Sequence, residues 1–256
     1  MKIAFATSEA YPFAKTGGLA DVSNALPAAL ARRGHDVRIF MPRYYVVDRE
    51  RFGLKMVGDP LGVPLGGGEK WAAILESRHI PDVPVYFIEH DQYFGRDGLY
   101  DDGHAAYPDN AERFIFFCHG VMRALRDLGF SPDIIHCNDW QTGLIPAYRK
   151  TLYGDDPFFR GSSAVMTVHN AGYQGVFPAE NYRLTGLDWK HFADDGLEFF
   201  SQMNFLKGGI LFADAVTTVS RKYAEELTTP EFGYDLTDVF RRVKGRFHGI
   251  TNGVDY

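Results

Sequence analysis

The stretch Lys15-Thr16-Gly17-Gly18-Leu19-Ala20-Asp21-Val22 joins a short apolar run to a helical pattern. The run before it, Lys2–Thr7, reads as a β-strand, and residues 19–33 repeat apolar side chains on one helix face. Two glycines at a helix N-terminus let bare backbone N–H groups approach an anion, which the helix dipole also favours. The glycines could equally make a tight turn, with Lys15 solvated and Asp21 satisfying the dipole. The stretch therefore predicts a strand-turn-helix unit and one candidate anion site.

The rest of the chain continues this alternation of strands and helices. Short β-rich runs followed by helical patterns are typical of a parallel sheet with crossover helices. The stretch PLGVPLGGGE, residues 60–69, reads as a turn between two antiparallel strands. Asp109 or Asn110 should cap the helix expected at residues 110–128. We therefore predict an α/β fold, a Rossmann-like parallel sheet with flanking helices. The expected strands are 2–7, 35–41, 83–89, 133–138, 163–168 and 215–219, and the expected helices are 19–33, 110–128, 142–152, 205–212 and 221–227.

Composition excludes several classes of protein. The 256 residues are 45% hydrophobic, which is ample material for a packed core. No window approaches the roughly twenty apolar residues of a membrane helix, and the N-terminus lacks a signal-peptide pattern, so no membrane partner is expected. With only Cys118 and Cys137, a disulfide scaffold is not expected and a reducing cytoplasm fits.

Charge argues against a nucleic-acid partner. The formal net charge is −6, and no lysine or arginine block occurs of the kind that phosphates reward. A local group of cations near the C-terminus more often marks a solvated surface than a site: Arg241, Arg242, Lys244 and Arg246. A neutral ligand such as a sugar, or an anion met by one or two placed cations, remains open.

Ligands of an open parallel sheet collect at the carboxyl ends of its strands, near the point where strand order reverses. One such end is His136-Cys137-Asn138-Asp139-Trp140. His, Cys and Asp, with His169 as a fourth ligand, invite a metal interpretation, but His136 and Cys137 point to opposite faces of a strand and cannot share one ion. We therefore expect no metal. Asp139 and Trp140 suit a sugar, or serve equally well as a helix cap and as core packing.

A second strand end is Thr167–Gly175, with the sequence TVHNAGYQG. A lone histidine is usually a structural hydrogen-bonding group, but His169 stands beside Asn170 and a glycine-rich loop, which favours contact with a ligand. No G-x-S-x-G elbow is present, so nothing supports a serine hydrolase. The first turn lacks G-x-G-x-x-G, which argues against a nicotinamide-dependent oxidoreductase, and no cofactor is expected.

Six motifs follow one another along the whole chain. They are KTGGLADV (15–22), HCNDW (136–140), TVHNAGYQG (167–175), FLKGG (205–209), TTVS (217–220) and TNGVD (251–255). In this order they resemble the bacterial glycogen synthases and plant starch synthases, one family of GT-B glycosyltransferases. KTGGLADV is highly specific to that family, whereas HCNDW and NGVD are shared more loosely with related glycosyltransferases.

The resemblance implies a GT-B architecture, in which two Rossmann-like domains face each other across a cleft. Residues 1–256 would be the N-terminal starch synthase catalytic domain, on the acceptor side, and a C-terminal nucleotide-binding domain would be absent. The reaction implied is retaining transfer of glucose from ADP-glucose to the non-reducing end of an α-1,4-glucan, glycogen or malto-oligosaccharide, in glycogen biosynthesis. The ending GITNGVDY, residues 249–256, fits a chain cut inside a strand-to-turn connection. We expect this polypeptide alone to be nearly inactive.

The resemblance also assigns roles on the donor side, position by position. Lys15 would contact the donor's phosphates, and Gly18 would pack against that end of the donor. Asp21, His169 and Asn170 would bind the transferred glucose. Lys15 and His169 would be the catalytic pair, since one neutralises developing phosphate charge and the other stabilises an oxocarbenium-like sugar.

The acceptor side matches the family less closely. Tyr100 and Asp139 would line the glucan path, but DGLYDDGHAAYPDN, residues 97–110, matches only roughly, so Tyr107 is an alternative to Tyr100. Residues that read the base should lie in the absent domain, so the sequence leaves ADP-glucose against UDP-glucose open. The alternative function is a non-catalytic glucan-binding module, which would bind malto-oligosaccharides without binding ADP-glucose.

Overall fold

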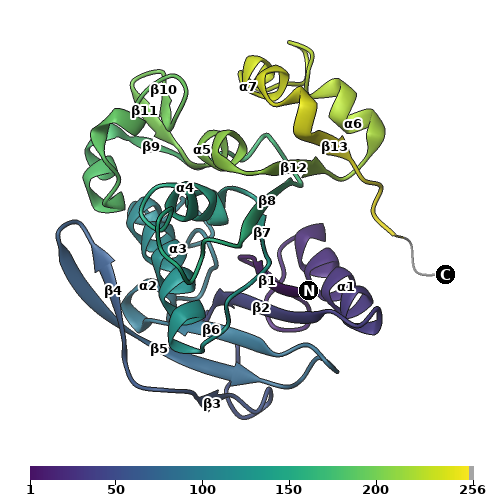
Figure 1. Ribbon diagram of the computed structural model, residues 1–256. Coiled ribbons are helices and arrows are strands. Elements are labelled where there is room, and N and C mark those ends of the chain that lie inside the picture. The colour runs from purple at the N-terminus through teal and green to yellow at the C-terminus, as the bar shows by residue number, and fades with distance from the viewer. Residues whose placement is uncertain (254–256) are drawn as a thin grey trace.

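The computed structural model describes residues 1–253 and builds them around one large sheet (Figure 1). Its strands are β1 (Lys2–Ala6), β2 (Asp36–Pro42), β3 (Lys55–Met56), β4 (Leu61–Leu65), β5 (Gly68–Ser77), β6 (Val85–Glu89), β7 (Ile134–Asn138), β8 (Ser163–Val168), β12 (Ala215–Thr218) and β13 (Phe247–Gly249). Within the described residues these ten strands lie in the order β13-β12-β8-β7-β1-β2-β6-β5-β3, with β4 paired to β5. From β13 to β6 the pairs are parallel, and β5, β3 and β4 add an antiparallel edge.

Helices cover both faces of this sheet, with α1 on one face and α3, α4 and α5 on the other (Figure 1). A small antiparallel sheet, β10-β11-β9, lies beside α5. The helices are α1 (Gly18–Arg32), α2 (Asp91–Phe94), α3 (Asn110–Asp127), α4 (Leu144–Lys150), α5 (Phe205–Phe212), α6 (Arg221–Glu226) and α7 (Thr237–Arg242), and the small strands are β9 (Val176–Pro178), β10 (Glu198–Phe199) and β11 (Gln202–Asn204).

The strand order reverses at β1, which is the feature that positions the site. Ala6, the last residue of β1, lies beside Phe40 on β2 and beside Cys137 on β7. The chain leaves β1 toward β2 on one side, whereas β7, β8, β12 and β13 extend the sheet on the other. Loops that follow β1, β7 and β8 therefore diverge at the same edge and leave room for a ligand.

Helix α3 fixes the segment between β6 and itself. Arg113 on α3 is fully buried, and its guanidinium donates to the backbone oxygens of Tyr93 and Leu99 and to Asn110 Oδ1. These bonds satisfy a buried charge that would otherwise be costly. They also hold the segment that carries Tyr100 against the body of the domain.

The predicted fold class is confirmed, and most predicted elements coincide with observed ones to within two residues. Residues 60–69 are only partly a turn, because β4 lies inside them and the reversal itself is made at Gly66 and Gly67, both at positive φ. The helix expected at 142–152 is a 3₁₀ turn, Trp140–Thr142, followed by α4. Part of the TNGVD motif, residues 254 and 255, lies outside the described residues.

The predicted N-cap position of α3 is confirmed at Asp109, but the expected capping hydrogen bond is absent. Asp109 occupies the N-cap position but its side chain makes no capping hydrogen bond, and Asn110 is already the first helical residue. The Asp109 carboxylate instead pairs with the guanidinium of Arg96, which lies 13 residues earlier. A charge-assisted bond to arginine is stronger than a neutral cap, so the ion pair takes the carboxylate.

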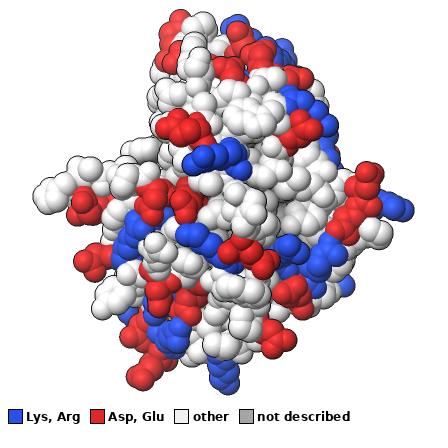
Figure 2. Space-filling view, turned by 90° about the vertical axis from the view of Figure 1, so that its left-hand side faces the viewer, with Lys and Arg blue, Asp and Glu red and all other residues white. Residues whose placement is uncertain are grey.

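Charged side chains of both signs are interspersed on the surface, as Figure 2 shows for one face. In the cationic group near the C-terminus, Arg242 pairs with Asp194, and Arg246 donates to the backbone oxygen of Leu211. Arg242 and Arg246 thus bond to neighbouring groups of the protein itself, as charged side chains on a surface often do. Among the helices of residues 1–253, none combines the length and apolarity needed to cross a bilayer.

A buried histidine on α3 predicts acid sensitivity of the fold. His119 stacks on Tyr148 with ring centroids 4.0 Å apart, and its Nε2–H donates to the backbone oxygen of Thr185 over 2.9 Å. Burial lowers the pKa of His119 from 6.5 to about 4. The unfolded state therefore takes up a proton below pH 6.5 that the folded state excludes until about pH 4, so this contribution to stability is complete above pH 6.5 and is lost as pH falls.

At about 1.4 kcal/mol per pKa unit, the whole contribution is on the order of 3–4 kcal/mol, of which about 2–3 kcal/mol is lost between pH 7 and pH 4.5. We expect His119→Gln to flatten the fall in unfolding free energy between pH 7 and pH 4.5 by roughly 2–3 kcal/mol. Urea unfolding at the two pH values measures it. The control is His104→Gln, on an exposed loop, which should leave the fall unchanged. An equal fall in unfolding free energy for wild type and His119→Gln would contradict the prediction.

Candidate functional site

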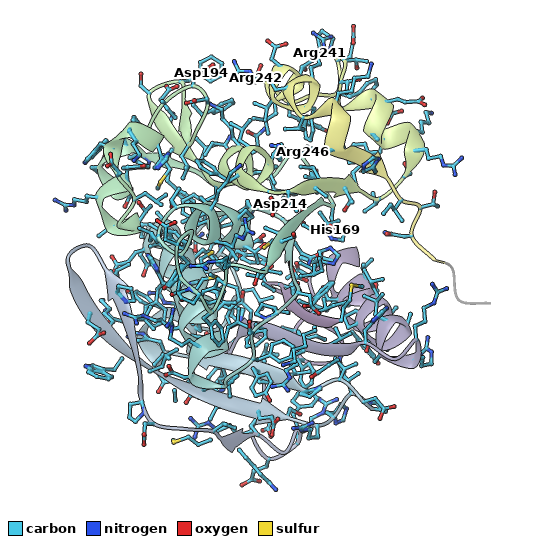
Figure 3. The ribbon with its side chains drawn as sticks, in the orientation of Figure 1. His169, Asp194, Asp214, Arg241, Arg242 and Arg246 are labelled. Carbon is cyan, nitrogen blue, oxygen red and sulfur yellow. The ribbon has the colours of Figure 1, made fainter. Side chains whose placement is uncertain are left out.

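A cleft of about 770 Å³ opens where the loops after β1, β7 and β8 diverge. It brings together five of the residues predicted from sequence: Gly18, Tyr100, Asp139, His169 and Asn170. A smaller cavity of about 310 Å³ lies between the β10–β11 hairpin and α7, and none of the predicted residues lines it. Figure 3 shows Asp194 and Arg242 of that cavity well away from His169. The large cleft is therefore the candidate site.

The glycine corner stands at one wall of the cleft. Gly17 is the N-cap of α1 and Gly18 its first residue, and a Cβ added to either would meet nothing within 4 Å. The space beside these two α-carbons is therefore open to a ligand. Lys15 and Asp21 do not line the cleft but flank the corner, and Lys15 Nζ lies 2.7 Å from each carboxylate oxygen of Asp21.

Glu9 is a site residue that the sequence analysis did not single out. It is 4% exposed, lines the cleft, and accepts hydrogen bonds from Thr16 N (2.5 Å), Thr16 Oγ1 (2.6 Å) and Gly17 N (3.3 Å). Its Oε1 lies 2.7 Å from the hydroxyl oxygen of Tyr100. One carboxylate thus joins the glycine corner to the loop that precedes α3. Its position just after β1 could have identified Glu9, because ligands are expected at the carboxyl ends of the strands.

Of the two tyrosines considered for the acceptor side, Tyr100 lines the cleft and Tyr107 does not. The Tyr100 hydroxyl donates to the Glu9 carboxylate, which can only accept, and therefore accepts from Ser8 Oγ at 2.7 Å. The ring of Tyr107 instead faces the guanidinium of Arg113, 4.9 Å from its centroid. Tyr107 is half-buried and thus belongs to the packing that supports this loop.

Asp139 fixes the backbone of the loop that follows β8. Its Oδ1 accepts from His169 N over 2.7 Å, so the carboxylate does not act as the helix cap that was one interpretation of the sequence. Burial raises the pKa of this carboxyl to about 7. The backbone at Asp139 has φ 56° and ψ −179°, a region that non-glycine residues rarely adopt. Trp140 fits both interpretations of the sequence, since it is 8% exposed, packs in the core and also lines the cleft.

His169 and Asn170 lie side by side at the end of β8. His169 Nε2 lies 3.0 Å from Asn138 Oδ1, and Asn170 Oδ1 accepts from Gly172 N over 2.9 Å. Burial lowers the pKa of His169 to about 4, so its imidazole is neutral at pH 7. Neither His136, which bonds Thr167 Oγ1, nor any other residue of 1–253 belongs to a group of three or more His, Cys, Asp or Glu side chains placed to hold a metal ion.

The contacts of Glu9 predict how the corner is held in shape. We expect Glu9→Ala to leave the N–H groups of Thr16 and Gly17 and the hydroxyl of Tyr100 without their acceptor, at a cost of about 1–3 kcal/mol. Amide hydrogen exchange at Thr16 and Gly17 should accelerate at least tenfold. Glu76→Ala, which removes the acceptor of Tyr86 elsewhere, is the control. Unchanged protection at Thr16 and Gly17 would show that Glu9 does not organise the corner.

The amino-acid sequence of the chain is similar to those of known starch and glycogen synthases. The family model described as "Starch synthase catalytic domain" matches residues 2–242. The glycogen synthase of Syntrophotalea carbinolica is 48% identical over all of this chain and 52% of its own length, and glycogen synthase 1 of Geobacter sulfurreducens is 46% identical over all of this chain and 52% of its own. The chain thus spans about half the length of the curated relatives it matches.

A solved structure shares the fold. The catalytic domain of starch synthase IV from Arabidopsis thaliana, bound to ADP and acarbose, superposes with a TM-score of 0.90 at 32% identity, covering 99% of this chain and 52% of that one. The sheet order and the cleft at its switch point define a Rossmann-like domain of the GT-B type. Since the family model matches nearly its whole length, the chain belongs to the starch synthase catalytic domain family.

Proposed function

We propose that this chain is the acceptor-side half of a glycogen synthase, which transfers glucose from ADP-glucose to the non-reducing end of an α-1,4-glucan with retention. The observation that carries the proposal is the cleft, where the glycine corner of α1 and the His169–Asn170 pair line the same space. The relatives named glycogen synthase and the plant neighbour bound to ADP and acarbose support the reaction and its two substrates.

On the donor side, Lys15 and the glycine corner would hold the diphosphate. An ammonium carries three donors, so Lys15 can keep Asp21 and still reach a phosphate oxygen. Glu9 already takes the Gly17 N–H, which leaves the orphan N–H groups of α1 from Gly18 onward for the phosphate. Positive charge and N–H dipoles at this point stabilise the charge that develops on the leaving diphosphate.

The transferred glucose would lie between Asp21, His169 and Asn170. Because Asn170 Oδ1 is bonded to Gly172 N, its NH₂ group is the part left for a sugar oxygen. A neutral imidazole at His169 adds no positive charge next to the developing oxocarbenium ion, which favours the transition state. The proton of the incoming hydroxyl passes to the diphosphate on the same face of the sugar. This reaction needs no metal or cofactor.

On the acceptor side, the glucan path would run past Tyr100 and Asp139. The Tyr100 hydroxyl is occupied by Glu9 and Ser8, so its ring is the surface that a sugar would contact. Asp139 would act through the loop it holds as well as through any free carboxylate oxygen. A second, nucleotide-binding domain would close over the cleft and read the base. A cytoplasmic location, which the buried, unpaired Cys118 and Cys137 suit, stays a prediction.

The test is a chimera that joins residues 1–253 to the second half of the Syntrophotalea carbinolica relative. We expect it to incorporate glucose from ADP-glucose into glycogen, and a parallel assay with UDP-glucose measures the donor preference. A folded chimera that transfers glucose from neither donor would overturn the proposed function.

The chain by itself should transfer glucose at least 10³-fold more slowly than the chimera. It would lack the other half of the charge that stabilises the diphosphate, and each lost donor of this kind costs about 2.7–4 kcal/mol. Calorimetric titration of the isolated chain with malto-oligosaccharide and with ADP-glucose tests the alternative function. Binding of malto-oligosaccharide without ADP-glucose binding, together with an inactive chimera, would favour a non-catalytic glucan-binding module.

A further inference from the structure

Asn138 links β1 to the histidine of the cleft. It is the last residue of β7, fully buried, and the mechanism above does not use it. Its Nδ2 lies 3.0 Å from the backbone oxygen of Ala6, at the end of β1, and its Oδ1 lies 3.0 Å from His169 Nε2. Three neighbouring parallel strands thus meet in one line of hydrogen bonds.

The chemistry of these groups leaves one arrangement of hydrogens. A backbone carbonyl can only accept, so the NH₂ group of Asn138 must face Ala6. The amide oxygen of Asn138 must then face His169, and an oxygen can only accept from the imidazole. His169 Nε2 therefore carries the hydrogen, and in a neutral ring Nδ1 carries a lone pair.

The remaining ring nitrogen is available to a ligand. Within residues 1–253, His169 Nδ1 has no hydrogen-bond partner, and it is not buried. His169 lines the cleft. The backbone of His169 is fixed separately, by the carboxylate of Asp139 on its N–H. Ring and backbone are thus held by consecutive residues, Asn138 and Asp139.

We propose that Asn138 is a positioning residue that fixes the tautomer of His169, so that His169 offers the cleft a hydrogen-bond acceptor and not a donor. An acceptor nitrogen takes a hydroxyl group and repels a phosphate oxygen. His169 is therefore specific for a sugar hydroxyl, and the donor cannot bind with its diphosphate at this position. The assignment of the ligand rests on the proposed function, whereas the tautomer does not.

The tautomer is measured on the whole chain by ¹⁵N NMR of labelled histidine at pH 7. We expect wild-type His169 to show one protonated nitrogen, Nε2, and one unprotonated nitrogen, Nδ1, without averaging. In Asn138→Leu the two resonances should move toward each other, because nothing selects a tautomer. In Asn138→Asp the carboxylate should hold the ring doubly protonated, so both nitrogens should appear protonated.

Asn204→Leu is the matched control, because Asn204 is equally buried but its side chain bonds Lys207 N and Gln174 Oε1. It should leave the His169 resonances unchanged. A protonated Nδ1 in the wild-type spectrum would overturn the proposal without any variant, even if Asn138→Leu fails to fold. Unchanged resonances in a folded Asn138→Leu would overturn it as well.

ADP-glucose added to the active chimera tests the ligand. The His169 Nδ1 resonance should shift while Nε2 stays protonated. A shift at Nε2 alone would contradict the assignment of the ligand. An inactive chimera whose His169 shows the expected tautomer would overturn the proposed function and leave the role of Asn138 standing.

Discussion

Lys15→Ala is expected to slow glucose transfer by the chimera about 10²–10³-fold, the largest effect of any single change on the donor side. Lys15 flanks the glycine corner beside Asp21, and removing a preorganised donor from a developing oxyanion costs about 2.7–4 kcal/mol. The loss should fall mainly on kcat, because the charge on the diphosphate grows as its bond to the sugar breaks. Initial rates at saturating glycogen over a range of ADP-glucose concentrations separate kcat from KM.

Lys190→Ala is the matched control for this change. Lys190 also lies near an aspartate, with Nζ 3.8 Å from Asp188 Oδ2, but it is exposed and does not line the cleft. Its loss should leave the rate within twofold of wild type. Asp21→Asn distinguishes the role of Lys15 from that of Asp21. It releases Lys15 from its ion pair but removes the carboxylate that we propose binds glucose. A Lys15→Ala chimera as fast as the Lys190→Ala chimera would mean that Lys15 does not meet the diphosphate.

The sequence predicts the parts of the site that lie at strand ends. Asp139, His169 and Asn170 follow apolar runs, and Gly18 begins the helix after the first strand. Parallel strands bring their carboxyl ends to one edge. The order of strands could not be derived from the pattern alone, but it was not needed for this inference. Whether a residue follows a strand depends on its neighbours in the sequence, so the hydrophobic pattern predicts it well.

Contacts between distant segments are what the pattern could not supply. Glu9 meets Tyr100, which is 91 residues away, and the Asp109 carboxylate pairs with Arg96 and makes no capping hydrogen bond. Both depend on how a loop folds back on the domain, and that path is set by the buried guanidinium of Arg113. A carboxylate has several possible partners in the sequence, and only the packed structure selects one.

The backbone of Asp139 is a second feature hidden from the sequence. Its φ of 56° with ψ of −179° costs about 1–3 kcal/mol, and the surrounding bonds must hold it. The hydrogen bond from His169 N to its carboxylate, and the packing of Trp140 directly after it, supply that hold. The strained turn is therefore stabilised by the same contacts that place His169 in the cleft.

Gly175→Ala is expected to destabilise the fold by about 2–5 kcal/mol, because two separate costs fall on one methyl group. Gly175 has φ 63°, which costs an L-residue roughly 1–2 kcal/mol. Its added Cβ would also lie 2.4 Å from Cε3 of Trp140. That ring cannot move aside, since Phe114, Phe177 and Phe205 pack around it, and overpacking of this kind costs about 1–3 kcal/mol more.

Gly186→Ala isolates the first of these costs. Gly186 has φ 69°, but nothing lies within 4 Å of the position of its Cβ. We expect it to lose only the roughly 1–2 kcal/mol of the backbone conformation. Urea unfolding of both variants, followed by tryptophan fluorescence, gives the difference between them as the cost of displacing Trp140. If the two variants were equally stable, the loop after β8 would yield at Gly175 without disturbing Trp140, and that ring could not be what braces the turn at Asp139.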